Sequence, residues 1–285
     1  MKKMISRRNF LAAAGVSAAA LGLAACGGSA STDAVSSEAV SSEAASSEAV
    51  STAEAAPAAL TTVTAGKLTM STNAAFPPYE MTTDAGTIEG IDIDTAQAIA
   101  DKLGLELQVD NMEFDSSLLS VQQGKADIVM AGVTVTPERQ NVMDFSDSYA
   151  TGIQSVIVTN DSEIATLEDL SGHLIGTQRG TTGYLYCTDD FGEDSVIAYD
   201  SGLTAVQALN NGQVDCVVID DAPAQAYVAA NPGLKVLDTS YAVEEYAIGI
   251  AKGNTALLDA VNAALAELAE EGTLQAIVDK YITAE

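Results

Sequence analysis

The chain has 285 residues, of which 47% are hydrophobic, 18% charged and 5% aromatic, and its formal net charge is −28. This length suggests about two domains, and the acidic balance excludes nucleic-acid binding through phosphate contacts and attachment to anionic lipid through a basic patch. One His and three Cys exclude a His-rich zinc or haem site, so we expect neither a metal nor a cofactor.

Residues 1–25 have the pattern of a cleaved export signal: basic residues precede an apolar run of about 16 residues, shorter than the roughly 20 that span a bilayer. Residues 6–11 (SRRNFL) resemble the twin-arginine export signature, and residues 23–26 (LAAC) resemble a lipobox. The two resemblances imply export followed by lipidation of Cys26, which anchors a protein without a transmembrane helix. The alternative is a Sec-type signal in which the two arginines only add charge.

Residues 26–65 consist largely of Ser, Ala, Glu, Thr and Val, and a five-residue repeat runs from residue 36 to residue 50. A period of five fits neither a helical face nor a strand. This composition predicts a disordered tether, with a transient helix as the alternative.

From residue 66 onward, strand-length apolar runs alternate with segments of helical period, which favours an α/β fold with parallel strands. The first group of predicted elements comprises strands at 67–71, 105–109 and 126–131 and helices at 94–103 and 118–123. The second group comprises strands at 155–158, 174–177 and 214–219 and helices at 167–170, after Gly180 and at 203–210. A strand at 246–251 and two amphipathic helices follow, and we expect both helices to pack on the first group.

Several short motifs follow one another along these elements. They are FPPYE at 76–80, GIDID at 90–94, GKADIV at 124–129, AGVTVTPER at 131–139, FSDSY at 145–149, GTTG at 180–183 and the segment 215–221. In this order and spacing the chain resembles the family 3, amino-acid-binding group of extracellular solute-binding proteins of ABC importers. The resemblance covers about 220 residues, and each motif by itself is weak.

The resemblance implies an α/β, two-lobed, periplasmic-binding-protein-like (type II) fold with a hinge of two crossing segments. Lobe 1 would comprise residues 66–152 plus 247–285, and lobe 2 would comprise residues 153–246. The chain would cross between the lobes near residues 149–154 and again near 245–247.

The same resemblance implies a monomeric, lipid-anchored receptor on the outer face of the cytoplasmic membrane. It would close its two lobes on a free amino acid and deliver it to an ABC transporter permease, without catalysis. One alternative is an enzyme similar to prephenate or arogenate dehydratases, which needs an acid in the cleft; Glu80 and Glu244 are the candidates. The other alternative is an amino-acid sensor module.

A zwitterion that leaves water needs a partner for each charge. Arg139 can bind a carboxylate with two parallel hydrogen bonds, as the Arg of the Thr-Pro-Glu-Arg motif does in the family, with the Thr134 hydroxyl close by in sequence. The alternative for Arg139 is a surface salt bridge with Glu138 or Asp144.

Thr181 and Thr182 open a predicted helix, so their N–H groups can form an anion site, or the residues can serve as an ordinary N-cap. By resemblance Thr182 contacts the ligand carboxylate directly, and Asp220 binds its ammonium group. Asp221 could exchange roles with Asp220. Gly132 has no side chain and allows a ligand to approach the backbone closely.

By resemblance Phe76 and Phe114 form apolar walls of the site, although either could be plain core. Some similar proteins that take cationic amino acids carry an acid where this chain has Asn73, so a polar neutral ligand is expected. Gln178 and Arg179 could also reach the side-chain end of the site.

Cys187 and Cys216 both fall in the second predicted lobe. In an exported protein two such residues can oxidise to a disulfide. Two buried thiols are the equally weighted alternative.

Overall fold

The computed structural model describes residues 60–282. The predicted signal peptide, the predicted lipidation site at Cys26 and most of the predicted tether lie outside these residues. The end of the predicted tether lies inside them: the N–H of Val63 donates to Asp127 Oδ1 at 2.7 Å. The structure thus starts a few residues before the predicted boundary at residue 66.

The described chain folds around one nine-stranded sheet that runs through both lobes. Its order is β5-β1-β6-β12-β7-β10-β8-β9, with β11 paired to β7. The strands are β1 (Lys67–Thr72), β5 (Glu106–Asn111), β6 (Ile128–Val129), β7 (Met143–Thr159), β8 (Ile175–Gln178), β9 (Val196–Tyr199), β10 (Cys216–Asp220), β11 (Leu234–Val236) and β12 (Ala242–Ala251). The expected parallel pairing occurs at each end of the sheet, whereas β7 and β12 are antiparallel to their neighbours in the middle.

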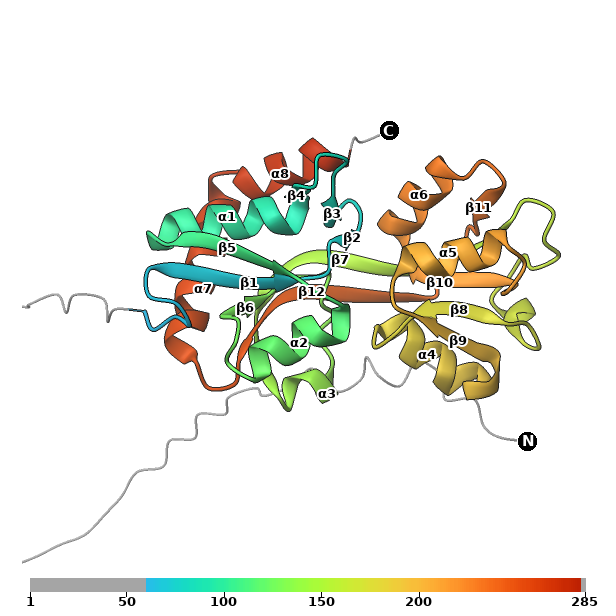
Figure 1. Cartoon of the computed structure of the whole chain (residues 1–285), viewed down its shortest axis with the longest axis horizontal. Helices are drawn as coiled ribbons and strands as arrows, with labels where there is room; N and C mark the ends of the chain where they lie inside the picture. Colours follow the sequence, from blue (N-terminus) through green and yellow to red (C-terminus); the bar gives the residue numbers. More distant parts are fainter. Residues whose placement is uncertain (1–59, 283–285) are drawn as a thin grey trace, which may run out of the picture. The chain divides into compact units, whose positions relative to one another are not determined.

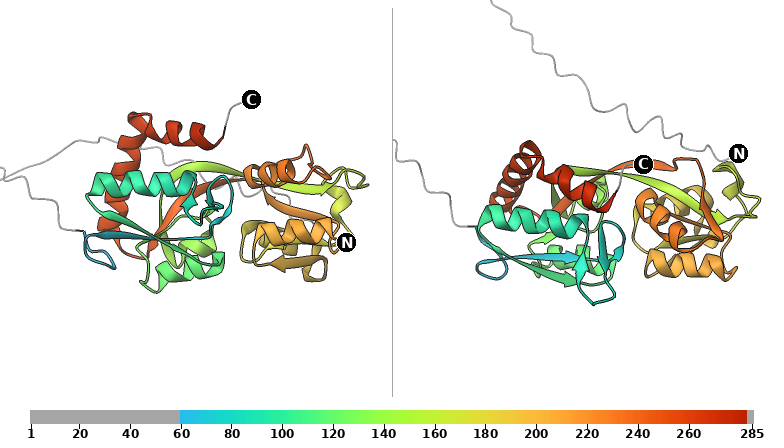
Figure 2. Two further views of the ribbon diagram at one scale, coloured as in Figure 1. Left: turned by 45° about the horizontal axis from the view of Figure 1, so that its top comes forward. Right: turned by 90° about the horizontal axis from the view of Figure 1, so that it is seen from above.

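Strands β7 and β12 cross between the two lobes side by side (Figure 1, Figure 2). Their register runs from the Gln154–Ala242 pair to the Met143–Ala251 pair, with bulges on both sides of Ala247. Both predicted crossing segments lie within these strands. The hinge is therefore a two-stranded ribbon, and we call β7 and β12 the hinge strands.

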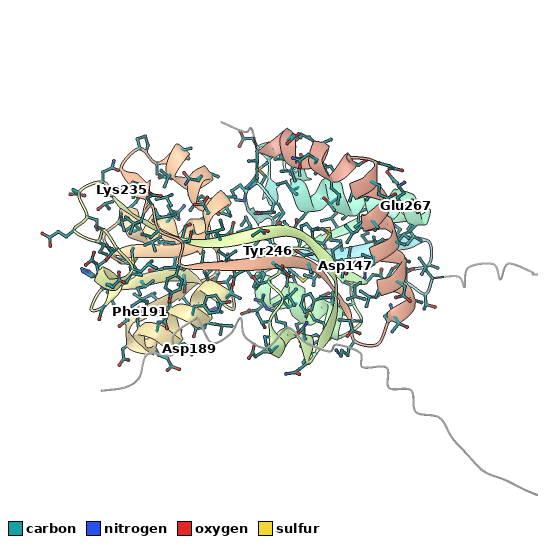
Figure 3. The ribbon with its side chains drawn as sticks, turned by 180° about the vertical axis from the view of Figure 1, so that it is seen from behind. Asp147, Asp189, Phe191, Lys235, Tyr246 and Glu267 are labelled. Carbon is teal, nitrogen blue, oxygen red and sulfur yellow. The ribbon has the colours of Figure 1, made fainter. Side chains whose placement is uncertain are left out.

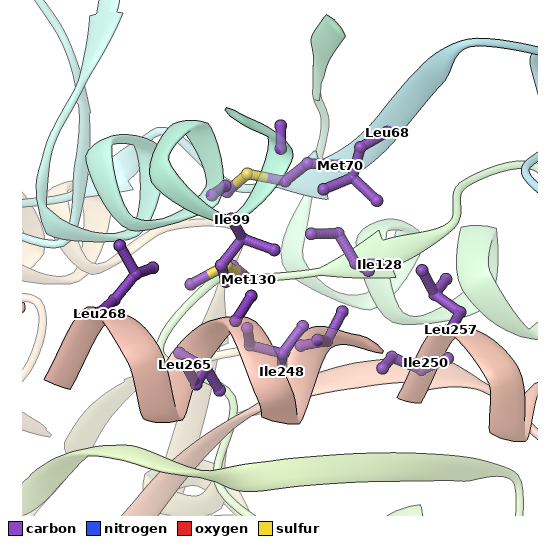
Figure 4. Packing of buried hydrophobic residues seen from close by; sticks show 14 of the residues in the cluster. Leu68, Met70, Ile99, Ile128, Met130, Ile248, Ile250, Leu257, Leu265 and Leu268 are labelled. Carbon is purple, nitrogen blue, oxygen red and sulfur yellow. The ribbon is translucent and has the colours of Figure 1, made fainter. Parts of the chain in front are cut away.

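Lobe 1 buries its core between the sheet and the helices α1 and α7, as Figure 4 shows. Leu257, Val261 and Leu265 of α7 pack in one cluster with Leu68 and Met70 of β1. This placement follows from the helical spacing of the apolar residues, which puts them on one face. The helices of this lobe are α1 (Ile91–Leu103), α2 (Phe114–Gln122), α3 (Pro137–Gln140), α7 (Thr255–Glu270) and α8 (Thr273–Tyr281).

Lobe 2 has two clusters of buried side chains, one on each face of its sheet strands. Cys187 and Cys216 lie in the same cluster as buried thiols. The helices of this lobe are η2 (Glu168–Leu170), α4 (Thr182–Phe191), η3 (Glu193–Ser195), α5 (Gly202–Asn210) and α6 (Asp221–Ala230).

A second, three-stranded sheet lies beside α1 in lobe 1 and has no counterpart among the predicted elements. It consists of β2 (Ala75–Phe76), β3 (Glu80–Thr82) and β4 (Ile88–Glu89) in the order β2-β3-β4. These strands have two or three residues, too few to show an alternating pattern. Their position matters because β2 and β3 place Phe76 and Glu80 at the cleft.

Within residues 60–282 no helix is both long and apolar enough to cross a membrane. The same residues hold no group of three or more His, Cys, Asp or Glu side chains arranged to bind a metal ion.

Candidate functional site

A cavity lies between the lobes, and residues from both lobes and from the hinge strands line it. All nine predicted ligand-binding residues are among its lining residues: Asn73, Phe76, Phe114, Gly132, Thr134, Arg139, Thr181, Thr182 and Asp220. The structure thus brings together side chains that are up to 147 positions apart in the sequence, from 73 to 220. Their contacts with a ligand stay a prediction.

Arg139 lies at the end of the short helix α3, where the Thr136 hydroxyl accepts from its backbone N–H and caps the helix. Its side chain is buried, and its guanidinium donates to the carbonyl oxygens of Thr134 in lobe 1 and Gly180 in lobe 2, at 2.8 and 3.1 Å. Burial lowers the pKa of Arg139, and the negative charge of Glu244 partly offsets this effect. A guanidinium has five N–H donors, so Arg139 keeps donors for a carboxylate.

The alternative surface salt bridge of Arg139 is absent from the described structure. Asp144 instead pairs with Lys252 at 2.7 Å. The guanidinium carbon of Arg139 lies 5.4 Å from the centroid of the Phe114 ring, within the range of a cation–π contact. Phe114 therefore supports the Arg139 side chain from the wall of the cavity.

Thr181 and Thr182 have different roles at the start of α4. Thr181 is the N-cap: its hydroxyl accepts from the N–H of Tyr184 and donates to the carbonyl of Gln178. The Thr182 hydroxyl is buried in the cleft, where it donates to Glu244 Oε2 at 3.0 Å. The N-cap alternative thus describes Thr181, and the Thr182 hydroxyl faces the cavity.

Asp220 lies at the end of β10 and is the N-cap of α6, accepting from the N–H of Ala222. Its Oδ2 atom also accepts from the Tyr246 hydroxyl at 2.7 Å and from the N–H of Ile153 at 2.8 Å. Burial raises the pKa of Asp220 to about 6, and these hydrogen bonds counteract part of the rise. Asp221 does not line the cavity; it accepts from the Ser155 hydroxyl instead.

Two amide side chains meet across the cleft at another wall of the cavity. Gln178 Nε2 donates to Asn73 Oδ1 at 2.9 Å, and Asn73 Nδ2 donates to the carbonyl of Met112. The suggestion that Arg179 also reaches the site is wrong, because its exposed side chain extends toward Asp200 and the carbonyl of Ala198. This wall is therefore neutral and polar.

Phe76 and Gly132 face each other at the apolar wall of the cavity. Gly132 has φ +55°, and a Cβ atom at this position would lie 2.7 Å from the Phe76 ring. Both the positive φ and the close approach require glycine. The Phe76 ring also stacks on Tyr79, with centroids 5.7 Å apart.

Behind this wall lies a buried pair of acids, Glu80 and Asp92: the sequence offers Glu80 only as the acid of the dehydratase alternative and does not predict Asp92 as a site residue. Glu80 lines the cavity, and both Glu80 and Asp92 are fully buried. Burial, followed by the negative charge of Asp92, raises the pKa of Glu80 well above its usual value; burial raises that of Asp92 to about 6. Asp92 Oδ2 accepts from the N–H of Gly132 and the hydroxyl of Tyr149. Asp92 thus holds the Gly132 turn in place, beside the buried Glu80.

The hinge strands supply three more buried polar residues: Gln154 of β7 and Glu244 and Tyr246 of β12. Tyr246 lies in the middle of the ribbon (Figure 3). The sequence offers Glu244 only as the acid of the dehydratase alternative. No sequence signal could have found it, because Val243, Glu244, Glu245 and Tyr246 do not alternate in polarity; only the structure shows that Val243 and Glu245 are exposed while Glu244 and Tyr246 are buried.

The protein has two lobes joined by two crossing strands, and buried charged groups from each lobe line one cavity. This architecture defines the class of two-lobed, type II periplasmic binding proteins. The chain belongs to the bacterial extracellular solute-binding proteins, family 3, whose family model matches residues 68–284. Its relatives are amino-acid-binding proteins of ABC transporters rather than enzymes, which points to a role without catalysis.

The chain is similar to the L-cystine-binding protein TcyJ of Escherichia coli K12, with 32% identity over 223 residues, 77% of this chain and 84% of that protein. It is 34% identical to the ABC transporter arginine-binding protein 1 of the same organism, over 76% of this chain and 91% of that protein. A solved structure of an ancestral arginine-binding protein bound to glutamine is 39% identical, with a TM-score of 0.74, over 77% of this chain and 99% of that one.

Proposed function

We propose that this chain is the substrate-binding lipoprotein of an ABC importer. It captures an amino acid with a polar neutral side chain between its lobes and delivers it to the permease. In this proposal residues 1–25 are removed on export, Cys26 carries the lipid anchor, and residues up to about 60 tether a monomeric receptor to the outer face of the cytoplasmic membrane.

The observation that carries the proposal is the presence of two buried groups of opposite charge on one cavity. Arg139 comes from lobe 1 and Asp220 from lobe 2, and both line the cavity. A zwitterion offers a carboxylate to the first and an ammonium group to the second. Since the two partners belong to different lobes, the ligand satisfies both charges only when the lobes are closed, which shifts the population toward the closed form.

The neutral polar wall supports the choice of ligand. The Asn73 and Gln178 amides can exchange their mutual hydrogen bond for bonds to a side-chain amide or a similar polar group. One solved relative is described as bound to glutamine, and one curated relative as binding L-cystine. Glutamine has an uncharged polar side chain, and the second half of cystine carries no net charge.

The test is isothermal titration calorimetry of the chain against the standard amino acids and cystine, followed by the variant Arg139→Ala. We expect one or a few polar neutral amino acids to bind. Arg139→Ala should weaken that binding by several kcal/mol, because a buried ligand carboxylate would lose its charged partner.

Arg179→Ala is the matched control, since it removes the same charge from an exposed side chain outside the cavity. It should leave the affinity unchanged. Unchanged binding in Arg139→Ala would refute the site, and turnover of a cyclohexadienyl acid would favour the dehydratase alternative.

A further inference from the structure

Glu244 is a buried acid that the proposed binding scheme does not use, and it is hydrogen-bonded to two residues that line the cavity, Thr134 and Thr182. It lies on β12, where successive side chains point to opposite faces. Val243 is 69% exposed, whereas Glu244 and Tyr246 are 5% and 1% exposed. Glu244 therefore points to the same side of the hinge ribbon as Tyr246, whose hydroxyl binds Asp220.

One oxygen of Glu244 accepts three hydrogen bonds from different parts of the molecule. Oε2 accepts from the hydroxyl of Thr134 at 3.2 Å, the hydroxyl of Thr182 at 3.0 Å and Nε2 of Gln154 at 2.9 Å. Thr134 belongs to lobe 1, Thr182 to lobe 2 and Gln154 to the hinge. A single carboxylate oxygen thus connects both lobes to the hinge strand.

Thr134 and Thr182 are the hydroxyls assigned to the carboxylate of the ligand, beside Arg139. Each hydroxyl has one hydrogen and can make one strong donation at a time. In this structure both donations go to Glu244. Glu244 thus holds the contacts that a ligand carboxylate would take.

The second oxygen of Glu244 shows that this arrangement has a cost. Among residues 60–282 no group donates a hydrogen bond to Oε1, although the atom is buried. A buried carboxylate oxygen without a donor is unfavourable. Packing alone therefore does not explain the acid at this position, since a buried charge is costlier than a neutral group of the same shape.

We propose that Glu244 is an affinity-setting residue that competes with the ligand carboxylate for the Thr134 and Thr182 hydroxyls, so that a ligand binds by taking these hydroxyls from it. This inference rests on the proposed function. Hydrogen bonds that a ligand must break oppose its binding, and the negative charge of Glu244 opposes a second carboxylate at the same place. Glu244 thereby weakens the affinity for any ligand with an α-carboxylate.

The test compares Glu244→Gln with the matched control Glu245→Gln, which removes the same charge from the adjacent, exposed side chain. The probes are L-glutamine, L-arginine and L-cystine, together with the α-carboxamides of glutamine and arginine. For any probe that the wild type binds, the affinity of Glu244→Gln should be about tenfold higher than that of the wild type, because both hydroxyls lose a charged acceptor. The gain should be smaller for the carboxamide, and Glu245→Gln should match the wild type.

Weaker or unchanged binding in Glu244→Gln, while the wild type binds a probe, would overturn this inference and leave the proposed function standing. Of these two outcomes, weaker binding would show that Glu244 contacts the ammonium group or a cationic side chain of the ligand. An equal gain for acid and carboxamide would also overturn it, since the effect would then not depend on the ligand carboxylate.

A second measurement needs no ligand. Spin labels at Lys125→Cys in lobe 1 and Asp194→Cys in lobe 2, both exposed positions, report the distance between the lobes in the full chain carrying Cys26→Ser. Cys187 and Cys216 are buried and stay unlabelled in the folded protein. Without ligand, Glu244→Gln should lengthen or broaden this distance relative to the wild type and Glu245→Gln. Identical distances in the three proteins would refute the role of Glu244 even if no probe bound.

Discussion

Burial controls the charge of individual acids in this cleft. Asp220 accepts hydrogen bonds from Tyr246 and Ile153, which favour its charged form, yet burial is the larger effect and raises its pKa to about 6. With this pKa, Asp220 is largely ionised at neutral pH but takes up a proton more readily than an exposed aspartate. An ammonium group beside it would restore the charged form.

This balance predicts that amino-acid affinity falls as the pH drops below about 6. The ligand ammonium group needs ionised Asp220, so below this pH binding must first release a proton, and affinity should fall by up to about tenfold per pH unit. Calorimetry between pH 5 and 7.5, in buffers of different ionisation enthalpy, measures both the affinity and the proton release. An affinity that stays constant or rises toward pH 5 would contradict the assignment of Asp220 as the partner of the ligand ammonium group.

Asp220→Asn separates this effect from Asp92, whose pKa burial also raises to about 6. The variant should bind weakly and should lose the pH dependence. The same raised pKa acts on stability in the opposite sense: the contribution of Asp220 to the free energy of unfolding is fully present below about pH 4, its usual range, and is lost as the pH rises through about 6.

At the scale of elements, the hinge ribbon positions the binding residues as well as connecting the lobes. Gly152 of β7 lies opposite Glu244 of β12, directly against the ring of Tyr246. A Cβ atom at Gly152 would lie 2.5 to 2.7 Å from three atoms at the hydroxyl end of Tyr246. The absence of a side chain here allows Tyr246 to reach Asp220.

Gly152→Ala should therefore displace Tyr246 from Asp220. Amino-acid binding should weaken on the order of tenfold, because Asp220 loses its hydrogen bond from the Tyr246 hydroxyl. It should also lower the melting temperature, because overpacking of a buried ring is destabilising. Titration calorimetry and thermal unfolding measure the two effects. Gly233→Ala is the control, as nothing lies within 4 Å of its Cβ position, and equal affinities in both variants would contradict this role of Gly152.

The sequence predicted the elements whose periodicity spans several residues, such as β1, α5 and α7. It did not predict β2, β3 and β4, which are too short to show a period, or the extent of β7. The predicted strand at 155–158 is only the end of β7, which begins at Met143. The preceding residues are polar and partly exposed because they form the ribbon between the lobes, so they lack the apolar run of a buried strand.

The same limit explains which site residues could be predicted. Arg139, Thr182 and Asp220 follow strands or open helices within short motifs, and the structure places all three on the cavity. Gln154, Glu244 and Tyr246 come from the antiparallel hinge strands, whose register joins residues 88 to 108 positions apart. No local pattern specifies that register. Glu80 and Asp92 belong to short motifs of the sequence, but their raised pKa values depend on complete burial, which the motifs do not show.

At the scale of the whole described molecule, the two lobes are not independent units. The sheet is continuous from β5 in lobe 1 to β9 in lobe 2, and the hinge strands are hydrogen-bonded to strands of both lobes. Each lobe also buries residues from distant parts of the chain, as α7 does on β1. Loss of one lobe would therefore expose strand edges and apolar side chains of the other.

This continuity predicts that residues 60–282 unfold in one cooperative transition. Differential scanning calorimetry should give one peak with equal calorimetric and van't Hoff enthalpies, as for a two-state protein. A ligand at one hundred times its dissociation constant should stabilise this whole transition by about 2.7 kcal/mol, because it binds only the folded form. Arg139→Ala should retain the single peak and lose the shift. Two peaks, of which the ligand moves only one, would show that the lobes fold separately and that the hinge ribbon does not couple them.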